Sequence, residues 1–173
     1  MFSAMVPSSA ILSPSVRLLQ AAANCRLFSL QILMILGLTA LSFSALAAGS
    51  KFKVADVFIN KQVIEVEYAD TASLRAQGLQ GRKSLCADCG MLFHFGTQRE
   101  TAMWMKNTFL PLDVAFITAS GTIANIEAME PMSLLSVPSN GAVLFALEMN
   151  QGWFAQHGIK AGDSIKLLDI RDE

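Results

Sequence analysis

Residues 54–68, VADVFINKQVIEVEY, decide the fold class because they form two apolar runs around a turn. Asn60 and Lys61 stand between the runs, and asparagine tolerates the positive φ that a two-residue hairpin requires. In the second run, apolar side chains alternate with Glu65 and Glu67, so one face of this strand is expected to be buried and the other wet. The stretch therefore predicts a β-hairpin.

The same pattern of short apolar runs and turn residues continues to the end of the chain. A helix is expected to begin at Asp70 or Thr71 and to end at Gly78. Further elements are expected as follows: strands at residues 91–95, 100–105, 114–117, 122–129, 142–149 and 165–170, a proline-bracketed loop at 131–138, and a helical turn at 152–157. About eight short strands with two short helices, and no βαβ alternation, predict a mostly-β domain, either an antiparallel sandwich or a closed barrel.

The first 47 residues differ in composition from this domain. Apolar residues make up 30 of them, against 61 of the remaining 126, and residues 27–50 carry no charge. The two charges that precede this stretch, Arg17 and Arg26, are both positive, and the apolar run ends in Ala45-x-Ala47. These features predict a signal peptide over residues 1–47, followed by a single domain over 48–173 and export to the periplasm or the extracellular space. The alternative is that residues 27–46 are retained as an anchor in the inner membrane.

The remaining chain has an unremarkable charge balance and one cysteine pair. It carries 11 basic and 14 acidic residues with no basic run, which argues against nucleic acid as a partner. Cys86 and Cys89 are expected to form a structural disulfide in an oxidising compartment. A redox dithiol and a soft-metal site with His94, which is expected on the outer face of its strand, remain alternatives. We expect no cofactor.

Four motifs follow one another between residues 75 and 113: RAQGLQGR at 75–82, GMLFHF at 90–95, WMKNT at 104–108 and PLD at 111–113. Together with Leu147-Glu148, Gly152 and Gly162-Asp163, their order and spacing resemble domain-of-unknown-function family 192, over about residues 53–170. The resemblance implies a mostly-β, sandwich-type fold and a small protein that is often exported. It implies no activity and supplies no catalytic residue.

The candidate site must therefore come from the residues themselves. Trp104, Lys106, Asn107 and Asp113 lie within ten residues, and strand alternation would place Trp104 and Lys106 on one face. An aromatic plane beside an ammonium, an amide and a carboxylate can recognise a small polar ligand such as a sugar. Three further residues complete the candidate ligand site: Arg75 and Arg82, which could grip an anionic group, and Glu148.

A purely structural interpretation of the same residues is also open. Asn107 and Asp113 would then organise loop backbone, Arg82 would pair with Glu148 or Asp113, and Trp104 would lie in the core. No catalytic residue is assigned, and whether the protein is an enzyme stays open.

The favoured function is a binding or accessory module of the cell envelope that recognises a small polar ligand or a glycan. One alternative is an enzyme, either a hydrolase that uses Asp113 and Glu148 or a thiol oxidoreductase that uses Cys86 and Cys89. The other is a soft-metal-handling protein. The sequence indicates no particular oligomeric state for the protein.

Overall fold

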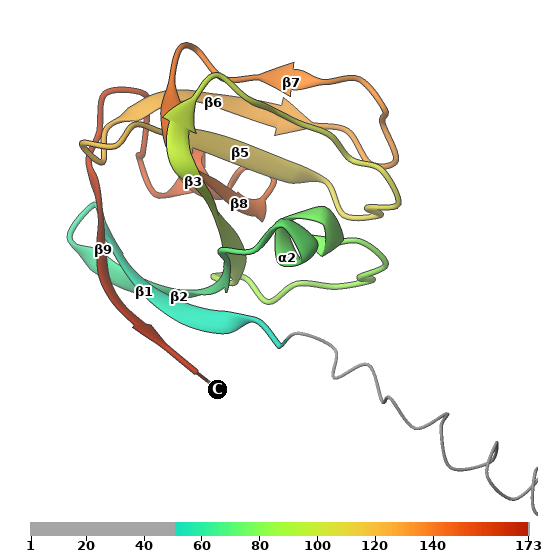
Figure 1. Cartoon of the computed structure of the whole chain (residues 1–173), viewed down its shortest axis with the longest axis horizontal. Coiled ribbons are helices and arrows are strands. Elements are labelled where there is room, and N and C mark those ends of the chain that lie inside the picture. Colours follow the sequence, from blue (N-terminus) through green and yellow to red (C-terminus); the bar gives the residue numbers. More distant parts are fainter. Residues whose placement is uncertain (1–50, 173) are drawn as a thin grey trace, which may run out of the picture. The chain divides into compact units, whose positions relative to one another are not determined.

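A computed structural model describes residues 51–172. These residues form nine strands and two short helices: β1 Lys53–Ile59, β2 Gln62–Ala69, α2 Ala72–Gln77, β3 Gly90–Arg99, β4 Ala102–Met103, β5 Leu112–Ile117, β6 Ile123–Met129, β7 Val137–Pro138, β8 Val143–Asn150, α3 Trp153–Gln156 and β9 Ile165–Arg171 (Figure 1). The mostly-β prediction is confirmed. The predicted signal peptide or anchor lies outside the described residues, and none of the helices described in residues 51–172 has the length and apolarity to cross a membrane.

The hairpin of residues 54–68 forms as predicted. β1 and β2 pair antiparallel from Lys53 and Tyr68 to Ile59 and Gln62. Asn60 and Lys61 make the turn with φ values of 43° and 67°, the left-handed conformation that a tight hairpin of this twist needs. The burial pattern predicted for β2 is also found, since Ile64 and Val66 are buried while Glu65 is exposed.

Seven strands form one curled sheet in the order β6-β5-β8-β3-β2-β1-β9. The expectation of an antiparallel sheet is corrected at one place, because β2 and β3 pair in parallel and the sheet is mixed. Parallel pairing requires a crossover from the end of one strand to the start of the next. Residues 70–89, which contain α2, form this crossover between β2 and β3.

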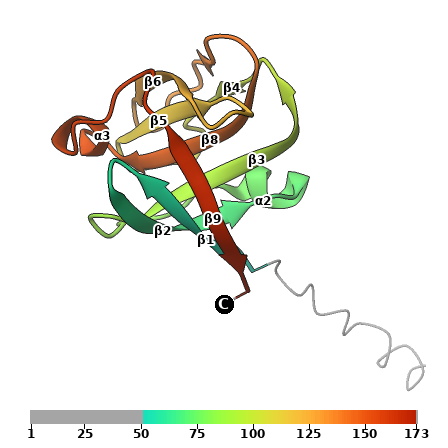
Figure 2. The same ribbon diagram turned by 90° about the vertical axis from the view of Figure 1, so that its left-hand side faces the viewer.

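The sheet does not close into a barrel. Its first and last strands, β6 and β9, do not pair with each other as a ladder; the residues just before them, Thr122 and Ser164, form an isolated bridge. The edge strand β9 pairs antiparallel with β1, as Figure 2 shows. The alternative of a closed barrel is therefore not realised.

Two hydrophobic clusters lie on opposite faces of the central strands. Alternate residues of β5 show this, because Ala115 and Ile117 belong to one cluster whereas Val114 and Phe116 belong to the other. The first cluster fills the inside of the curl, together with Trp153 of α3. The second contains side chains from α2 and from the segments around β4 and β7, which cover the outer face. All six residues of β5 are buried as a result.

Two local expectations about the outer face need correction. The strand expected at residues 100–105 is only the two-residue β4, because the chain turns away at Lys106 and Asn107. Part of the expected proline loop, Val137–Pro138, forms the two-residue β7 and pairs with β4. Pro138 is tolerated because this two-stranded sheet has only edge strands.

Candidate functional site

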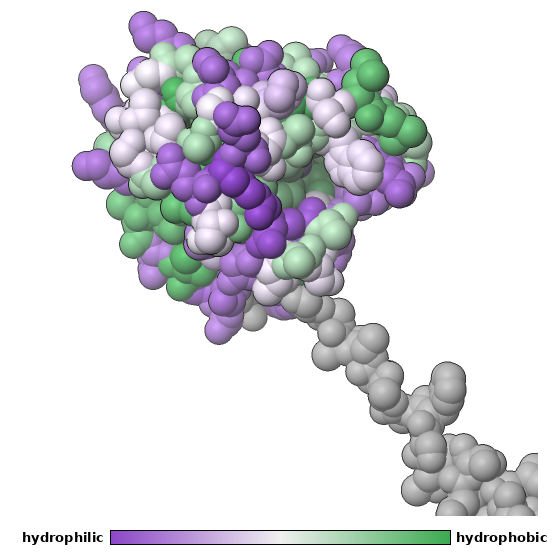
Figure 3. All heavy atoms as spheres, turned by 45° about the horizontal axis from the view of Figure 1, so that its top comes forward, coloured by the Kyte–Doolittle hydropathy of each residue, from purple (hydrophilic) through white to green (hydrophobic). Residues whose placement is uncertain are grey.

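A cleft of about 240 Å³ opens over the outer face of the sheet. It lies between the end of α2, the far end of β3 and the chain that follows β4, and the residues that line it include Arg75, Arg99, Trp104, Lys106 and Glu148. In the space-filling view, hydrophilic residues gather beside a hollow on one face of the molecule (Figure 3). Four residues that the sequence singles out, Arg75, Trp104, Lys106 and Glu148, therefore line one cleft.

Glu148 lies in the middle of β8, where its neighbours in the sheet are Met91 of β3 and Val114 of β5. It is only 4% exposed, and its carboxyl group makes no hydrogen bond or ion pair with any residue in the described part of the chain. Burial raises the pKa of Glu148 to about 8. Glu148 is therefore mostly protonated at neutral pH, and its hydroxyl can donate a hydrogen bond into the cleft.

Trp104 forms part of the wall of this cleft. Its side chain is 54% exposed, which excludes the core position of the structural interpretation. The Lys106 Nζ lies 5.5 Å from the centre of its ring, within the range of a cation–π contact. Trp104 and Lys106 do not lie on a strand, and Lys106 belongs to a turn; both are nevertheless exposed, and Met105 between them is buried.

Two arginines reach the cleft from different elements. Arg75 lies in the last turn of α2, and its Nη1 donates to the carbonyl oxygens of Asp70 at 2.7 Å and His94 at 2.8 Å. These bonds fix the guanidinium in place. Arg99 is the last residue of β3, is exposed, and lies 5.3 Å from the ring centre of Phe95.

Arg82 and Asn107, which the sequence analysis also proposes as ligand-binding residues, are held elsewhere. Arg82 forms a forked ion pair with Glu67, with both N···O distances 2.5 Å, and not the pair with Glu148 or Asp113 that the structural interpretation expects. Asn107 adopts a left-handed φ of 56°, and its carbonyl oxygen accepts from the Gly81 N–H at 2.9 Å. Its side chain donates to Gln80, so Asn107 links two loops.

Asp113 is buried, and its partner is the backbone. One carboxylate oxygen accepts the N–H of Gly152 at 2.8 Å, which holds the turn between β8 and α3. The residues on either side of Asp113, Leu112 and Val114, belong to the outer cluster, so Asp113 itself points to the inner face. Glu148 points to the outer face, and the two carboxyl groups do not form the pair that a glycoside-type hydrolase needs.

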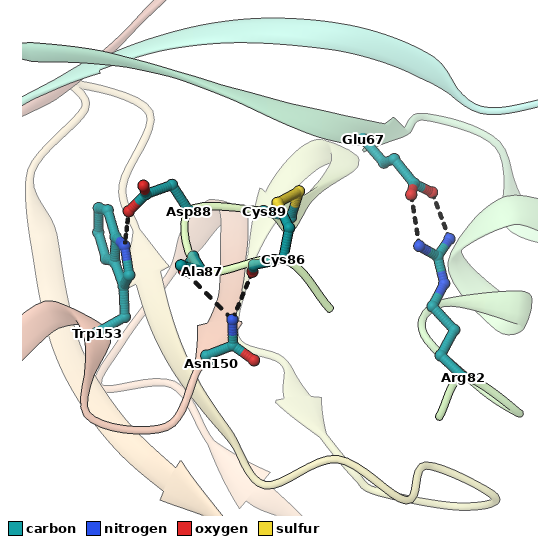
Figure 4. Close-up of a disulfide and its surroundings, with 8 residues drawn as sticks. All are labelled: Glu67, Arg82, Cys86, Ala87, Asp88, Cys89, Asn150 and Trp153. Carbon is teal, nitrogen blue, oxygen red and sulfur yellow. Dashed lines mark hydrogen bonds and ion pairs between the residues drawn. A yellow bond between two sulfur atoms is a disulfide. The ribbon is translucent and has the colours of Figure 1, made fainter. Parts of the chain in front are cut away.

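The cysteine pair forms a disulfide in a β-turn just before β3 (Figure 4). The Asn150 side chain donates to the carbonyl oxygens of Cys86 and Ala87 from the end of β8. Within the same turn, Asp88 accepts a 2.9 Å hydrogen bond from the indole of Trp153. The disulfide turn is thus fastened to the start of α3.

The residues suggested for soft-metal binding are not brought together. His94 does not lie on an outer face without a partner: its Nδ1 is 2.8 Å from the Tyr68 hydroxyl, and its ring stacks on Phe145 inside the curl. Burial, with the nearby Arg75 as a smaller cause, lowers the pKa of His94. Among residues 51–172, no group of three or more His, Cys, Asp or Glu side chains could hold a metal ion.

Sequence reasoning does not identify Arg99 as part of the site. It lies at the end of β3, which runs four residues beyond the expected end at Phe95. A register shift between His94 and Arg99 separates the two parts of the ladder with β8. The glycine at 96, with a φ of 78°, is the signal in the sequence for such an irregularity.

Comparison with known proteins identifies a family and two similar solved structures. No match is found among curated proteins. One solved structure, from Sinorhizobium meliloti 1021, is described as a "putative transcription regulator"; it is 37% identical, with a TM-score of 0.62, and the match covers 68% of this chain and 94% of that one. A protein of unknown function from Novosphingobium aromaticivorans DSM 12444 is 31% identical, with a TM-score of 0.62 and coverage of 70% and 91%. The family model of DUF192, "Uncharacterized ACR", matches residues 55–167, and the chain belongs to this family.

Proposed function

We propose that the protein is a binding module that recognises a small polar ligand or glycan in the cleft over the outer face of the sheet. The observation that carries this proposal is the Glu148 carboxyl group, which is buried at the cleft and has no partner among residues 51–172. Its oxygens are open to the cleft, since no side-chain oxygen or nitrogen of residues 51–172 is both fully enclosed and without a hydrogen bond. A ligand in the cleft could therefore accept a hydrogen bond from the protonated carboxyl group.

The wall of the cleft supplies the second element of recognition. The half-exposed ring of Trp104 is a flat apolar surface beside charged groups, which suits stacking against the face of a sugar ring. Lys106 and Arg99 add hydrogen-bond donors around it. The arrangement contains donors and a stacking surface but no second carboxylate, which favours binding over hydrolysis.

The proposal is tested by titrating the isotope-labelled protein with neutral and charged mono- and oligosaccharides and following its backbone amide resonances. We expect saturable shifts at residues of the cleft, and an affinity at least tenfold lower in Trp104→Ala. Phe109→Ala is the matched control, because Phe109 is also an exposed aromatic residue in this segment but does not line the cleft. Absence of binding across the panel, or binding unchanged in Trp104→Ala, would contradict the proposal.

We also propose that the module acts in the cell envelope after export directed by residues 1–47. The support is the apolar N-terminal segment together with the disulfide, since Cys86 is exposed and disulfides persist in oxidising compartments. A nucleic-acid role has less support, because 13 basic residues stand against 14 acidic ones in the chain. Cell fractionation, with N-terminal sequencing of the mature protein, tests export, and a chain found uncleaved in the cytoplasm would refute it.

A further inference from the structure

The charges around the cleft point beyond a polar ligand in general. Three cationic side chains line it, Arg75, Arg99 and Lys106, whereas Glu148 is the one acidic residue among its lining residues. Two nearby acids outside the cleft are already paired: Glu67 with Arg82, and Asp70 with Lys53 at 3.2 Å. A third, Glu100, is exposed and does not line the cleft. The residues that line the cleft therefore carry an excess of positive charge.

Arg99 and Lys106 are available to a ligand. Each lies over an aromatic ring, at 5.3 Å from Phe95 and 5.5 Å from Trp104, and neither forms an ion pair within the described residues. Both cations are exposed, and a cation–π contact at an exposed site contributes about 0.5–1 kcal/mol, less than a charge-assisted hydrogen bond of about 1.5–3 kcal/mol. An anionic group in the cleft would therefore compete for both cations.

We propose that the ligand of this cleft carries a carboxylate or phosphate group, which Arg99 and Lys106 bind while Glu148 donates a hydrogen bond to it. This inference rests on the proposed function and specifies the class of its ligand. Because Trp104 forms the wall beside the same cations, the anionic group belongs to a molecule whose ring stacks on the indole, such as a uronic acid or a sugar phosphate.

Glu148 makes this recognition dependent on pH. The neutral acid can donate to an anion, whereas the ionised carboxylate repels it. The charged groups that face Glu148 across the cleft are Arg75 of α2, Arg99 of β3 and Lys106 after β4, and its strand neighbours Met91 and Val114 are apolar. Affinity for an anion is therefore expected to fall as the pH rises through the pKa of Glu148, about 8.

The test compares glucuronate, glucose 6-phosphate, glucose and inorganic phosphate by calorimetry or amide-shift titration. We expect the two charged sugars to bind at least tenfold more tightly than glucose. If glucose binds as tightly as they do, the inference is overturned while the proposed function stands. If no probe binds, both fail. Inorganic phosphate that binds as tightly as glucose 6-phosphate would support the anionic site and identify free phosphate as its ligand.

Variants separate the charges of the cleft from charge in general. Arg99→Gln and Lys106→Gln should each weaken glucuronate binding at least fivefold. Lys83→Gln is the matched control, because Lys83 also lies over an exposed ring, 5.6 Å from Phe109, but not in the cleft. Equal losses in Lys83→Gln and Lys106→Gln would overturn the inference.

Glu148→Gln tests the donor. The amide keeps a donor and removes the titration, so this variant should bind glucuronate at pH 7 and keep its affinity to pH 9. The wild-type protein should lose at least fivefold over the same range, and glucuronate stays singly charged throughout. A wild-type affinity that does not change between pH 7 and pH 9 would refute the role of Glu148.

Discussion

Each face of the central strands carries one buried acid and one tryptophan, and the two pairs have opposite properties. On the inner side, Asp113 accepts a backbone N–H and Trp153, 3% exposed, donates to Asp88. On the outer side, Glu148 has no partner among residues 51–172 and Trp104 is half exposed. The same residue types therefore stabilise the fold on one face and are left free to bind on the other.

The largest difference between the two faces should be the loss of stability when each tryptophan is replaced by alanine. Trp153→Ala removes a side chain that packs against Phe154 and His157 in the inner cluster, and a large-to-small change of this kind costs about 3–5 kcal/mol. Trp104→Ala should change the free energy of unfolding by less than about 0.5 kcal/mol, as exposed positions usually do. Urea unfolding followed by circular dichroism measures both. Similar losses in the two variants would end the distinction between the faces.

Glu148 should make the stability of the protein depend on pH. Its pKa is raised from the usual 4.5 to about 8 in the folded state, so the folded protein holds the proton more tightly than the unfolded chain. The stabilisation is complete below about pH 4.5 and is lost as the pH rises toward 8. Between pH 5 and pH 9 this loss should amount to about 3–4 kcal/mol, since a tenfold change in proton affinity corresponds to about 1.4 kcal/mol.

Glu148→Gln provides the control for this effect, because a buried amide does not titrate. The difference in unfolding free energy between wild type and variant should therefore change with pH, with the variant relatively more stable at pH 9 than at pH 5. A constant difference across this range would show that Glu148 is not buried as an acid.

Substitution of Asp113 should cause a smaller loss of stability, which depends on its acceptor oxygen and not on its charge. Asp113→Ala leaves the Gly152 N–H without an acceptor and should cost about 1–3 kcal/mol. Asp113→Asn keeps an acceptor oxygen and should lose less than half as much. Thermal unfolding of the two variants at pH 7 makes this comparison, and glucuronate binding should be unaffected in both. A variant that loses binding while it keeps its stability would place Asp113 in the site after all.

The local features were predictable because they depend on neighbouring residues. The hairpin at Asn60 and Lys61 follows from positive-φ tolerance, and α2 begins at Thr71, whose hydroxyl accepts from the Leu74 N–H at 3.2 Å. Trp104 and Lys106 are exposed on either side of the buried Met105, as the sequence pattern suggests, although no strand forms there and Lys106 belongs to a turn. Such signals lie within a few residues of the feature that they specify.

The composition of the cleft could be predicted only in part because it depends on register between distant strands. Which faces Asp113 and Glu148 occupy follows from the pairing of β5 with β8, over a separation of more than thirty residues. The parallel pairing of β2 with β3, and with it the position of α2 and Arg75, has no local signal. Arg99 reaches the cleft through an irregular ladder that alternation does not describe.

The pairing of the first strand with the last has a consequence for how the chain folds. β1 is bordered by β2 on one side and by β9 on the other, so residues 165–171 complete the sheet. Contacts of such long sequence separation form slowly, and here they cannot form before residues 165–171 have been synthesised. Until β9 emerges, one edge of β1 has no partner strand, and an unpaired strand edge is open to pairing with another chain.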